Sequence, residues 1–584
     1  MKKRILLLAL ALALTSSILA PIPASAVAPP GCVISFPDPN FEAAVRRCIS
    51  KPTGAITQSD VADVKRLWVG YLNVSSVSGI EYFTSMTEFN CRNNNLTELD
   101  VSKNPNLEIL ECSQNQLTEL DVSINPKLKE LSCDNNRLTV LDISKNPELR
   151  LFDCYGNQLT QLDLSKNTAL EEIYCSGNLM TELDLSQNTE LRKFSCLFGQ
   201  LTKLDLSKNI ALVSLDCSYN RLTDLNVSNN TALKELYCYF NRLTDLDTSN
   251  NAALTYLYCF SNKLATLDVS RNTELEELDC GCNRLTELDV SKNTGLRQLG
   301  CYSNQLTKLD VSKNPSVDYI MCNSNQLTDL DVSKNTVLVS LYCDYNLLTK
   351  LDLSKNTVLT VLCCENNYLP DKTAIAGLDE NNLDIFDFGS QRTSAPNLDT
   401  AAEWAKAEIG SALKKGFVPV YMQGNYNNSI TRQEFCYMLV KFIEYSLQKD
   451  MESILDERGL SIRYNTFSDT IDMDILAAFA LGITDGTKAP TDALSGSFTP
   501  DGPLTRQEAA VMIMRVCKVI GMDVSDPPAS GFVDMDSAGS WARDGINFVS
   551  ANGIMGGISA AAPTFDPGGA VTRQESIVIF DRIR

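Results

Sequence analysis

Histidine is absent from the 584-residue sequence. Its absence removes the commonest general base of enzymes, every Ser–His or Cys–His nucleophile pair and every His-ligated metal centre. Basic residues are also scarce, since 51 Lys and Arg face 72 Asp and Glu, for a formal net charge of −21. That charge repels phosphate backbones, so nucleic acid is not expected as a partner. We expect a protein that is not an enzyme and that uses no cofactor and no metal.

The sequence also lacks a hydrophobic run long enough to span a membrane. Its longest apolar stretch near the start, residues 5–13, follows basic residues and is followed by small residues that end at Ala26. This order is typical of a secretory signal peptide over residues 1–26, whereas a spanning helix needs about 20 apolar residues. We therefore expect a secreted protein with no transmembrane segment.

Most of the twenty cysteines lie on one 21-residue period. The unit around each of them reads L-x-x-L-x-C-x-x-N-x-L-T-x-L-D-V-S-K-N, and one such unit cannot bury its own leucines, so neighbouring units must stack. Stacked strands place equivalent cysteines about 4.8 Å apart, whereas the β-carbons of a disulfide lie about 3.8 Å apart. We expect buried free thiols. The periodic residues are Cys91, Cys112, Cys133, Cys154, Cys175, Cys196, Cys217, Cys238, Cys259, Cys280, Cys301, Cys322, Cys343 and Cys364.

This unit is a leucine-rich repeat with cysteine in one leucine slot, and its 21-residue register is similar to that of the bacterial internalins. The resemblance implies a solenoid of parallel strands over residues 85–390, with a helical cap over residues 27–84. An asparagine three residues after each cysteine, replaced only at Gly199, is expected to bond backbone groups at the turn. Outside the array, Cys32 and Cys48 are expected to form a disulfide across the cap.

Aromatic residues crowd the outward-facing slots beside the cysteines in the middle of the array, and basic residues follow four positions after the cysteine. These slots point onto the concave face of the solenoid. One interpretation is a tyrosine-rich sheet with ordinary strand preference. The other is a binding face for a protein or a glycan, because exposed aromatic surface is unfavourable unless it is used, and Tyr and Arg are enriched at binding hot spots. The predicted contacts are Tyr219, Tyr237, Tyr239, Phe240, Tyr256, Tyr258, Phe260, Tyr302, Arg242 and Lys263.

The composition changes from about Asp399 onward, where the leucine pattern stops and helical patterns begin. The motif T-R-Q-E precedes an apolar helical run three times, beginning at Thr431, Thr505 and Thr572. The first and third of these units carry a tryptophan twelve residues before a glycine. This segment resembles three S-layer homology repeats, at residues 399–445, 466–521 and 531–584, after a linker at residues 391–398.

The resemblance implies an all-α module of pseudo-threefold symmetry that holds a secondary cell-wall polysaccharide. Thr-x-x-Glu alone is a capping box, which is expected at any helix start. Capping does not require an arginine, and a cation beside free amides at a helix start favours a carboxylate ligand. The predicted polymer contacts are Arg432, Arg506, Arg573, Trp404 and Trp541. The middle unit lacks the tryptophan.

Together these features predict a multidomain α+β protein. The leading hypothesis is a non-enzymatic surface binding protein or adhesin of a bacterium, secreted and attached to the cell wall. Two alternatives stay open: a structural component of the surface layer, and a freely secreted repeat protein whose C-terminal repeats do not bind wall polymer.

Overall fold

The structure is a computed structural model that describes residues 31–389, 391, 398, 400–419, 422–460, 462, 466–470, 472–488, 496–558 and 563–583. The predicted signal peptide lies outside the described residues, as does most of the predicted linker. The chain divides into two compact units, Met1–Cys301 and Tyr302–Arg584. Within the described ranges, no helix has both the length and the apolar character needed to cross a membrane.

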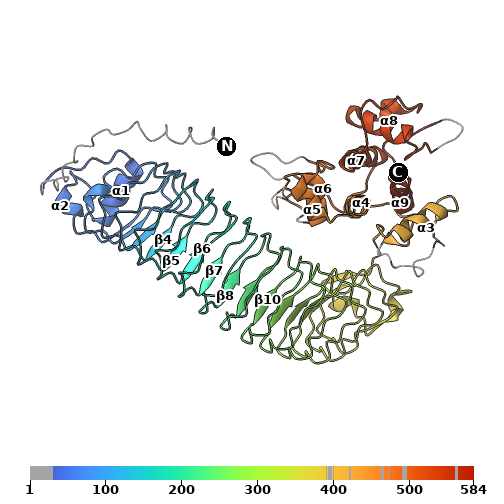
Figure 1. The fold of residues 1–584 in the computed structure, drawn as a ribbon, viewed down its shortest axis with the longest axis horizontal. Helices are drawn as coiled ribbons and strands as arrows, with labels where there is room; N and C mark the ends of the chain where they lie inside the picture. The colour runs from blue at the N-terminus through green and yellow to red at the C-terminus, as the bar shows by residue number, and fades with distance from the viewer. Residues whose placement is uncertain are drawn as a thin grey trace, which may run out of the picture. The chain divides into compact units, whose positions relative to one another are not determined.

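The first unit begins with a short helical cap, which is followed by a ladder of three-residue strands (Figure 1). Helix α1 starts at a proline, and the Asp38 carboxylate accepts hydrogen bonds from its first amides. The elements of this unit are α1 (Pro39–Cys48), α2 (Gln58–Val61), β1 (Arg66–Trp68), η1 (Ile80–Tyr82), β2 (Glu88–Asn90), β3 (Ile109–Glu111), β4 (Glu130–Ser132), β5 (Leu151–Asp153), β6 (Glu172–Tyr174), β7 (Lys193–Ser195), β8 (Ser214–Asp216), β9 (Glu235–Tyr237), β10 (Tyr256–Tyr258), β11 (Glu277–Asp279) and β12 (Gln298–Gly300).

Strands β1 to β12 pair in parallel and in chain order. The middle residue of each strand is buried and the residues on either side face outward, as the two-residue period of a strand requires. The ladder therefore begins at β1, inside the segment that the sequence assigned to the cap, because Val69 occupies the buried position that cysteine takes in later repeats.

A buried asparagine column ties each turn of the ladder to the next. The side-chain amide of Asn241 donates to the carbonyls of Cys217 at 2.9 Å and Cys238 at 3.2 Å, and its oxygen accepts from the Leu222 amide at 3.0 Å. The same pattern repeats along the column, for example at Asn136. Gly199 interrupts the column, because glycine has no side-chain amide to bond the backbone of the preceding turn. The predicted role of these asparagines is confirmed.

The cysteine column is buried, and its side chains are thiols. Burial raises the pKa of Cys112 to about 12, so this thiol stays protonated and inert. The disulfide predicted between Cys32 and Cys48 is wrong for this structure, where both thiols are free. Cys32 contacts the Val33 carbonyl at 3.8 Å, whereas Cys48 at the end of α1 contacts the Arg66 carbonyl at 3.6 Å.

The second unit starts with the last turns of the ladder, which close on a glutamine. The Gln391 amide donates to the Cys364 carbonyl at 2.9 Å, and its oxygen accepts from the Asn367 amide at 3.1 Å, so Gln391 takes the part of one more ladder asparagine. The elements of this part are β13 (Tyr319–Met321), β14 (Ser340–Tyr342), β15 (Leu351–Asp352), β16 (Val361–Cys363), η2 (Lys372–Ala374), β17 (Ile375–Ala376), η3 (Glu380–Asn382) and β18 (Ile385–Asp387).

A helical module completes the second unit, and its helices pack between repeats. The first helix of one repeat lies against the second helix of the preceding repeat: α8 on α7, α6 on α4 and, in the same cyclic order, α3 on α9. The elements are α3 (Lys406–Lys415), α4 (Arg432–Leu447), α5 (Met451–Glu457), α6 (Met473–Ala480), α7 (Arg506–Val519), η5 (Met535–Ser537), η6 (Ser540–Ala542), α8 (Arg543–Ala551) and α9 (Arg573–Arg582).

Three backbone hydrogen bonds close this module into a ring. The Ile430 amide donates to the Val571 carbonyl at 2.9 Å, Val571 donates to Leu504 at 3.0 Å, and Leu504 donates back to Ile430 at 3.4 Å. All three side chains are buried. The three repeats therefore share one core around a pseudo-threefold axis.

We predict that Asn241→Ala destabilises the ladder strongly. The change leaves the buried Leu222 amide without its acceptor and removes one of the two asparagine donors from each of the Cys217 and Cys238 carbonyls. We expect the free energy of unfolding to fall by about 3 kcal/mol. Asn229→Ala is the matched control, because Asn229 is exposed and bonds only at the surface, and its effect should stay within about 0.5 kcal/mol. Urea unfolding followed by circular dichroism measures both, and equal effects would contradict the ladder's role.

Candidate functional site

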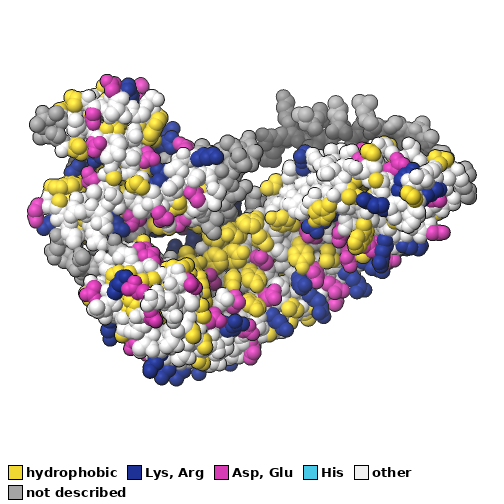
Figure 2. Space-filling model, turned by 180° about the vertical axis from the view of Figure 1, so that it is seen from behind, with side chains coloured by type: hydrophobic (Ala, Val, Ile, Leu, Met, Phe, Trp, Pro, Cys, Tyr) yellow, Lys and Arg dark blue, Asp and Glu magenta, His cyan; other side chains and the backbone are white. Residues whose placement is uncertain are grey.

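The outward positions of the middle strands form the first candidate site, which we call the strand face. Two sets of rings stack here. Phe198, Tyr219 and Phe240 stack in series at centroid distances of 4.4 and 4.5 Å, and Tyr239 stacks on Phe260 at 4.4 Å. Figure 2 shows hydrophobic side chains, tyrosine included, gathered over the repeats of the ladder. The structure thus brings the predicted aromatic residues Tyr219, Phe240, Tyr239 and Phe260 into contact with one another.

The backbone under three of these rings adopts a left-handed conformation. Phe198, Tyr219 and Phe240 have φ of 54°, 53° and 50° at the turn position two residues after the cysteine. Most other repeats place Asn, Gly, Ser or Gln there, which tolerate this conformation. A ring at such a position is disfavoured by roughly 1 kcal/mol or more. Backbone geometry therefore does not account for these aromatic residues.

The other predicted contacts of the first unit lie on the same repeats and on their turns. Tyr237 and Tyr258 meet edge to face at 5.3 Å, and Tyr256 is the first residue of β10. Arg242 and Lys263 lie on the turn that follows the asparagine column, where their backbone amides donate to the carbonyls of the preceding repeat. Tyr302 belongs to the second unit, where Tyr319 and Tyr342 also pair at 5.6 Å.

Sequence reasoning missed the carboxylates of the strand face. Asp216 and Asp279 end β8 and β11, and both are half-buried. Burial raises the pKa of Asp279 to about 6, and it also raises the pKa of Asp216. Both residues stand immediately before a cysteine of the 21-residue period, so reading that column of the repeat alignment would have found them.

The second candidate site is the helical module, where each T-R-Q-E arginine pairs with the glutamate of the next repeat. Arg432 donates to Glu508 at 2.7 Å and Arg506 to Glu575 at 3.2 Å, while Arg573 pairs with Glu434 and completes the circle. The arginines are only 5 to 7% exposed. These glutamates lie up to 139 residues away in the chain, which is why the motif alone did not reveal the pairing.

The amides at the three helix starts are already occupied. The arginine amide of each motif donates to a loop carbonyl of the next repeat: Arg432 to Gly502, Arg506 to Gly569 and Arg573 to Asn428. The next amide in each helix also donates to that loop, and the threonine hydroxyl takes the third. The sequence argument expected these amides to be free for a carboxylate ligand, and that expectation is wrong, because the neighbouring repeat uses them.

The two tryptophans of the module reach the surface. Trp404 is 53% exposed and Trp541 is 58% exposed. The glutamine of the preceding T-R-Q-E motif holds each tryptophan loop: Gln507 accepts from the Gly539 amide at 3.0 Å, and Gln574 from the Ala402 amide at 2.9 Å. The threonine of the motif therefore caps a helix, and its glutamine holds the loop that carries the tryptophan of the next repeat.

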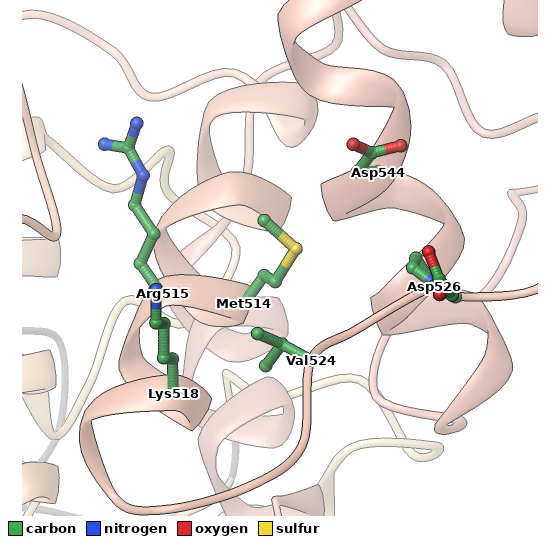
Figure 3. Close-up of a pocket in the computed structure, with 7 residues that line it drawn as sticks. Met514, Arg515, Lys518, Val524, Asp526 and Asp544 are labelled. Carbon is green, nitrogen blue, oxygen red and sulfur yellow. The ribbon is translucent and has the colours of Figure 1, made fainter.

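Surface grooves lie among the helices of this module. One, of about 480 Å³, lies between α7 and α8 and has basic side chains on the α7 side and an acidic side chain on α8 (Figure 3). Its lining includes Met514, Arg515, Lys518, Val524, Asp526 and Asp544. Another, of about 630 Å³, runs along α3 and is lined by Lys406, Lys414, Lys415 and the exposed Tyr445. Lysines and an aromatic ring suit an anionic polymer.

The functional domain of InlJ from Listeria monocytogenes, which includes a cysteine ladder, is similar to this chain. The two are 38% identical, with a TM-score of 0.57, over 58% of this chain and 77% of that one. This chain is an internalin-type leucine-rich-repeat protein. The leucine-rich-repeat protein LIC12759 of Leptospira interrogans shares the fold, at 20% identity and a TM-score of 0.50 over 56% of the internalin-type chain and 97% of its own.

The helical module has relatives of another kind. Residues 531–575 of the internalin-type chain match the S-layer homology domain. The surface-layer 125 kDa protein of Lysinibacillus sphaericus is 25% identical over 182 residues, which are 31% of this chain and 14% of that protein. Both matches indicate a cell-surface protein.

We predict that Arg506→Ala destabilises the helical module. The change removes donors to Glu575 and to the carbonyls of Phe565 and Gly556, and breaking such a buried pair lowers stability by about 3 kcal/mol or more. Arg543→Ala is the control, because Arg543 and its partner Asp536 are exposed. Thermal unfolding followed by tryptophan emission compares them. A normal transition in Arg506→Ala would show that the ring is dispensable.

We also predict that Asp279→Asn raises stability at pH 7. The pKa of Asp279 is about 6 in the folded state and about 3.9 in an unfolded chain. The folded state thus holds its proton more tightly, and the parent gains stability as the pH falls through 6. The advantage of Asn should therefore shrink between pH 7 and pH 5. Melting temperatures at both pH values test this, with exposed Glu274→Gln as the control; a pH-independent difference would refute it.

Proposed function

We propose that this protein is a non-enzymatic surface binding protein or adhesin, held at the cell wall by its S-layer homology repeats. The observation that carries the proposal is the pair of exposed indoles, Trp404 and Trp541, each on a loop that the glutamine of the preceding T-R-Q-E motif holds at the same place in its repeat. The wall-facing ligand is a secondary cell-wall polysaccharide, and the strand face binds a protein or a glycan.

Several contacts support wall binding. Sugar rings stack on exposed indoles, and Lys406, Lys414 and Lys415 suit an acidic polymer. The buried arginines Arg432, Arg506 and Arg573 fit a supporting part, because their ion pairs fix the loops and helices that frame the grooves. The middle repeat carries Thr470 in place of a tryptophan, so its groove is expected to contribute least.

The strand face supports the second half of the proposal. Its rings stack on one another while Phe198 stays 41% exposed, and three of them stand at turn positions that disfavour them. A surface of this kind is retained when a ligand covers it.

We predict that Trp404→Ala with Trp541→Ala weakens binding to purified cell walls at least tenfold, because both sugar-stacking surfaces are lost. Co-sedimentation of the full chain measures it, with walls tested before and after the secondary polysaccharide is stripped. Trp68→Ala is the matched control, because Trp68 is an exposed indole on β1 of the ladder, and it should bind walls normally.

The outcomes separate the alternatives. Binding that disappears with the polymer and with the two indoles supports wall attachment. Absence of binding to unstripped walls would leave a freely secreted repeat protein, and concentration-dependent assembly without polymer would favour a structural surface-layer component.

A further inference from the structure

The centre of the strand face carries four carboxylates in two rows. The cross-strand register places Glu235, Tyr256 and Glu277 side by side in one row. The other row runs Asp216, Tyr237, Tyr258, Asp279. All of these residues are at the first or third position of three-residue strands, so they face the same side, away from the buried middle residue. We call the four carboxylates the acidic centre.

The strands of the acidic centre contain no basic residue at an outward position. The outward residues of β8 to β12 are Ser214, Asp216, Glu235, Tyr237, Tyr256, Tyr258, Glu277, Asp279, Gln298 and Gly300. Where the ladder does place a lysine among such positions, it pairs: Lys193 lies 3.2 Å from Glu172 on the neighbouring strand. The basic run that includes Arg242 and Lys263 follows later, on the turn beyond the asparagine column.

Two of the four carboxylates, those of Asp216 and Asp279, are half-buried with few hydrogen-bond partners. The Gly281 amide donates to Asp279 at 3.0 Å and is the one group that lowers its pKa, whereas burial raises that pKa to about 6. Asp216 likewise accepts from the Ser218 amide at 3.0 Å. Desolvating an unpaired carboxylate is unfavourable. A cation delivered by a ligand would relieve this penalty at both positions.

The tyrosines and one glycine complete the surroundings. A β-carbon at Gly300 would come within 2.8 Å of the Asp279 carboxylate, so glycine on β12 leaves room for that carboxylate. The Tyr258 hydroxyl donates to Glu277, and the Ser214 hydroxyl donates to Glu235 at 2.7 Å. Ammonium and guanidinium groups bind best where aromatic rings and carboxylates lie together. A neutral sugar could stack on the rings and donate hydroxyls to the carboxylates, but it would leave their negative charge uncompensated, and an acidic ligand would be repelled.

We propose that the acidic centre binds lysine or arginine side chains of a basic protein segment, so that the ligand of the strand face is cationic. This inference rests on the proposed ligand-binding function of the strand face and adds the chemical class of the ligand.

The test uses labelled octalysine, octaglutamate and chitohexaose with the full chain at 0.15 M salt, followed by fluorescence anisotropy. The variant Asp216→Asn/Asp279→Asn removes two charges from the acidic centre. The variant Glu274→Gln/Glu287→Gln removes two charges from exposed positions of the same repeat region and is its matched control. We expect octalysine to bind the parent. Its affinity for the Asn pair should be about tenfold lower than for the parent, and its affinity for the Gln pair less than twofold lower.

Three results would overturn the inference: no octalysine binding by the parent, equal weakening in both pairs, or tighter binding of octaglutamate or chitohexaose that the Asn pair retains. Unfolding would not imitate the expected result, because Asp279→Asn is predicted to be more stable at pH 7. Tyr237→Ala/Tyr258→Ala separates the two proposals. If a probe binds through these tyrosines but not through the carboxylates, the strand face is a binding face, but the proposal of a cationic ligand is refuted. If binding of no probe depends on either set of residues, the proposal that the strand face binds a ligand is refuted.

Discussion

Both units depend on one constraint: no repeat can satisfy its own backbone hydrogen bonds. In the ladder, one buried asparagine serves carbonyls of two successive turns and accepts an amide from the earlier one. In the helical module, the first amides of each helix donate to a loop of the next repeat. Unpaired buried amides and carbonyls are strongly unfavourable, so in each unit the neighbour is a condition of folding and not an addition to it.

This division of labour explains where binding surfaces can arise. The asparagine, leucine and cysteine columns hold the ladder from within, which leaves the first and third residues of each strand without a structural duty. Those positions can then carry rings and carboxylates that the fold itself does not need, such as Tyr237 or Asp216. The same reasoning applies between repeats of the helical module. The T-R-Q-E arginine is buried in an ion pair with the next repeat, whereas the tryptophans Trp404 and Trp541 are exposed at the surface.

Much of this architecture follows from local patterns in the sequence. The 21-residue period predicts the parallel ladder and the buried thiols, and the three Thr-x-x-Glu motifs predict helix starts that the structure confirms. The partners of Arg432, Arg506 and Arg573 could not be predicted this way, because each glutamate comes from another repeat and only the ring closure brings them together. The expected Cys32–Cys48 disulfide was also beyond the sequence pattern, because the cap has no repeat that fixes the distance between two of its cysteines. The positions of Asp216 and Asp279 could be read from the repeat alignment. Their raised pKa could not, because it comes from desolvation in the folded structure.

The ends of the two repeat systems show why one is open and the other closed. A parallel ladder has two edges whose backbone groups lack a neighbour, so it needs end pieces: at its C-terminal end Gln391 supplies the amide that the next asparagine would have given. The helical module avoids edges by joining its third repeat to its first through Ile430 and Val571. Adding a repeat to the ladder lengthens it without disturbing either end, whereas adding or removing one in the ring would leave an arginine, a glutamate and a set of helix-start amides unpaired. The ladder can therefore vary in length, whereas the helical module is fixed at three repeats.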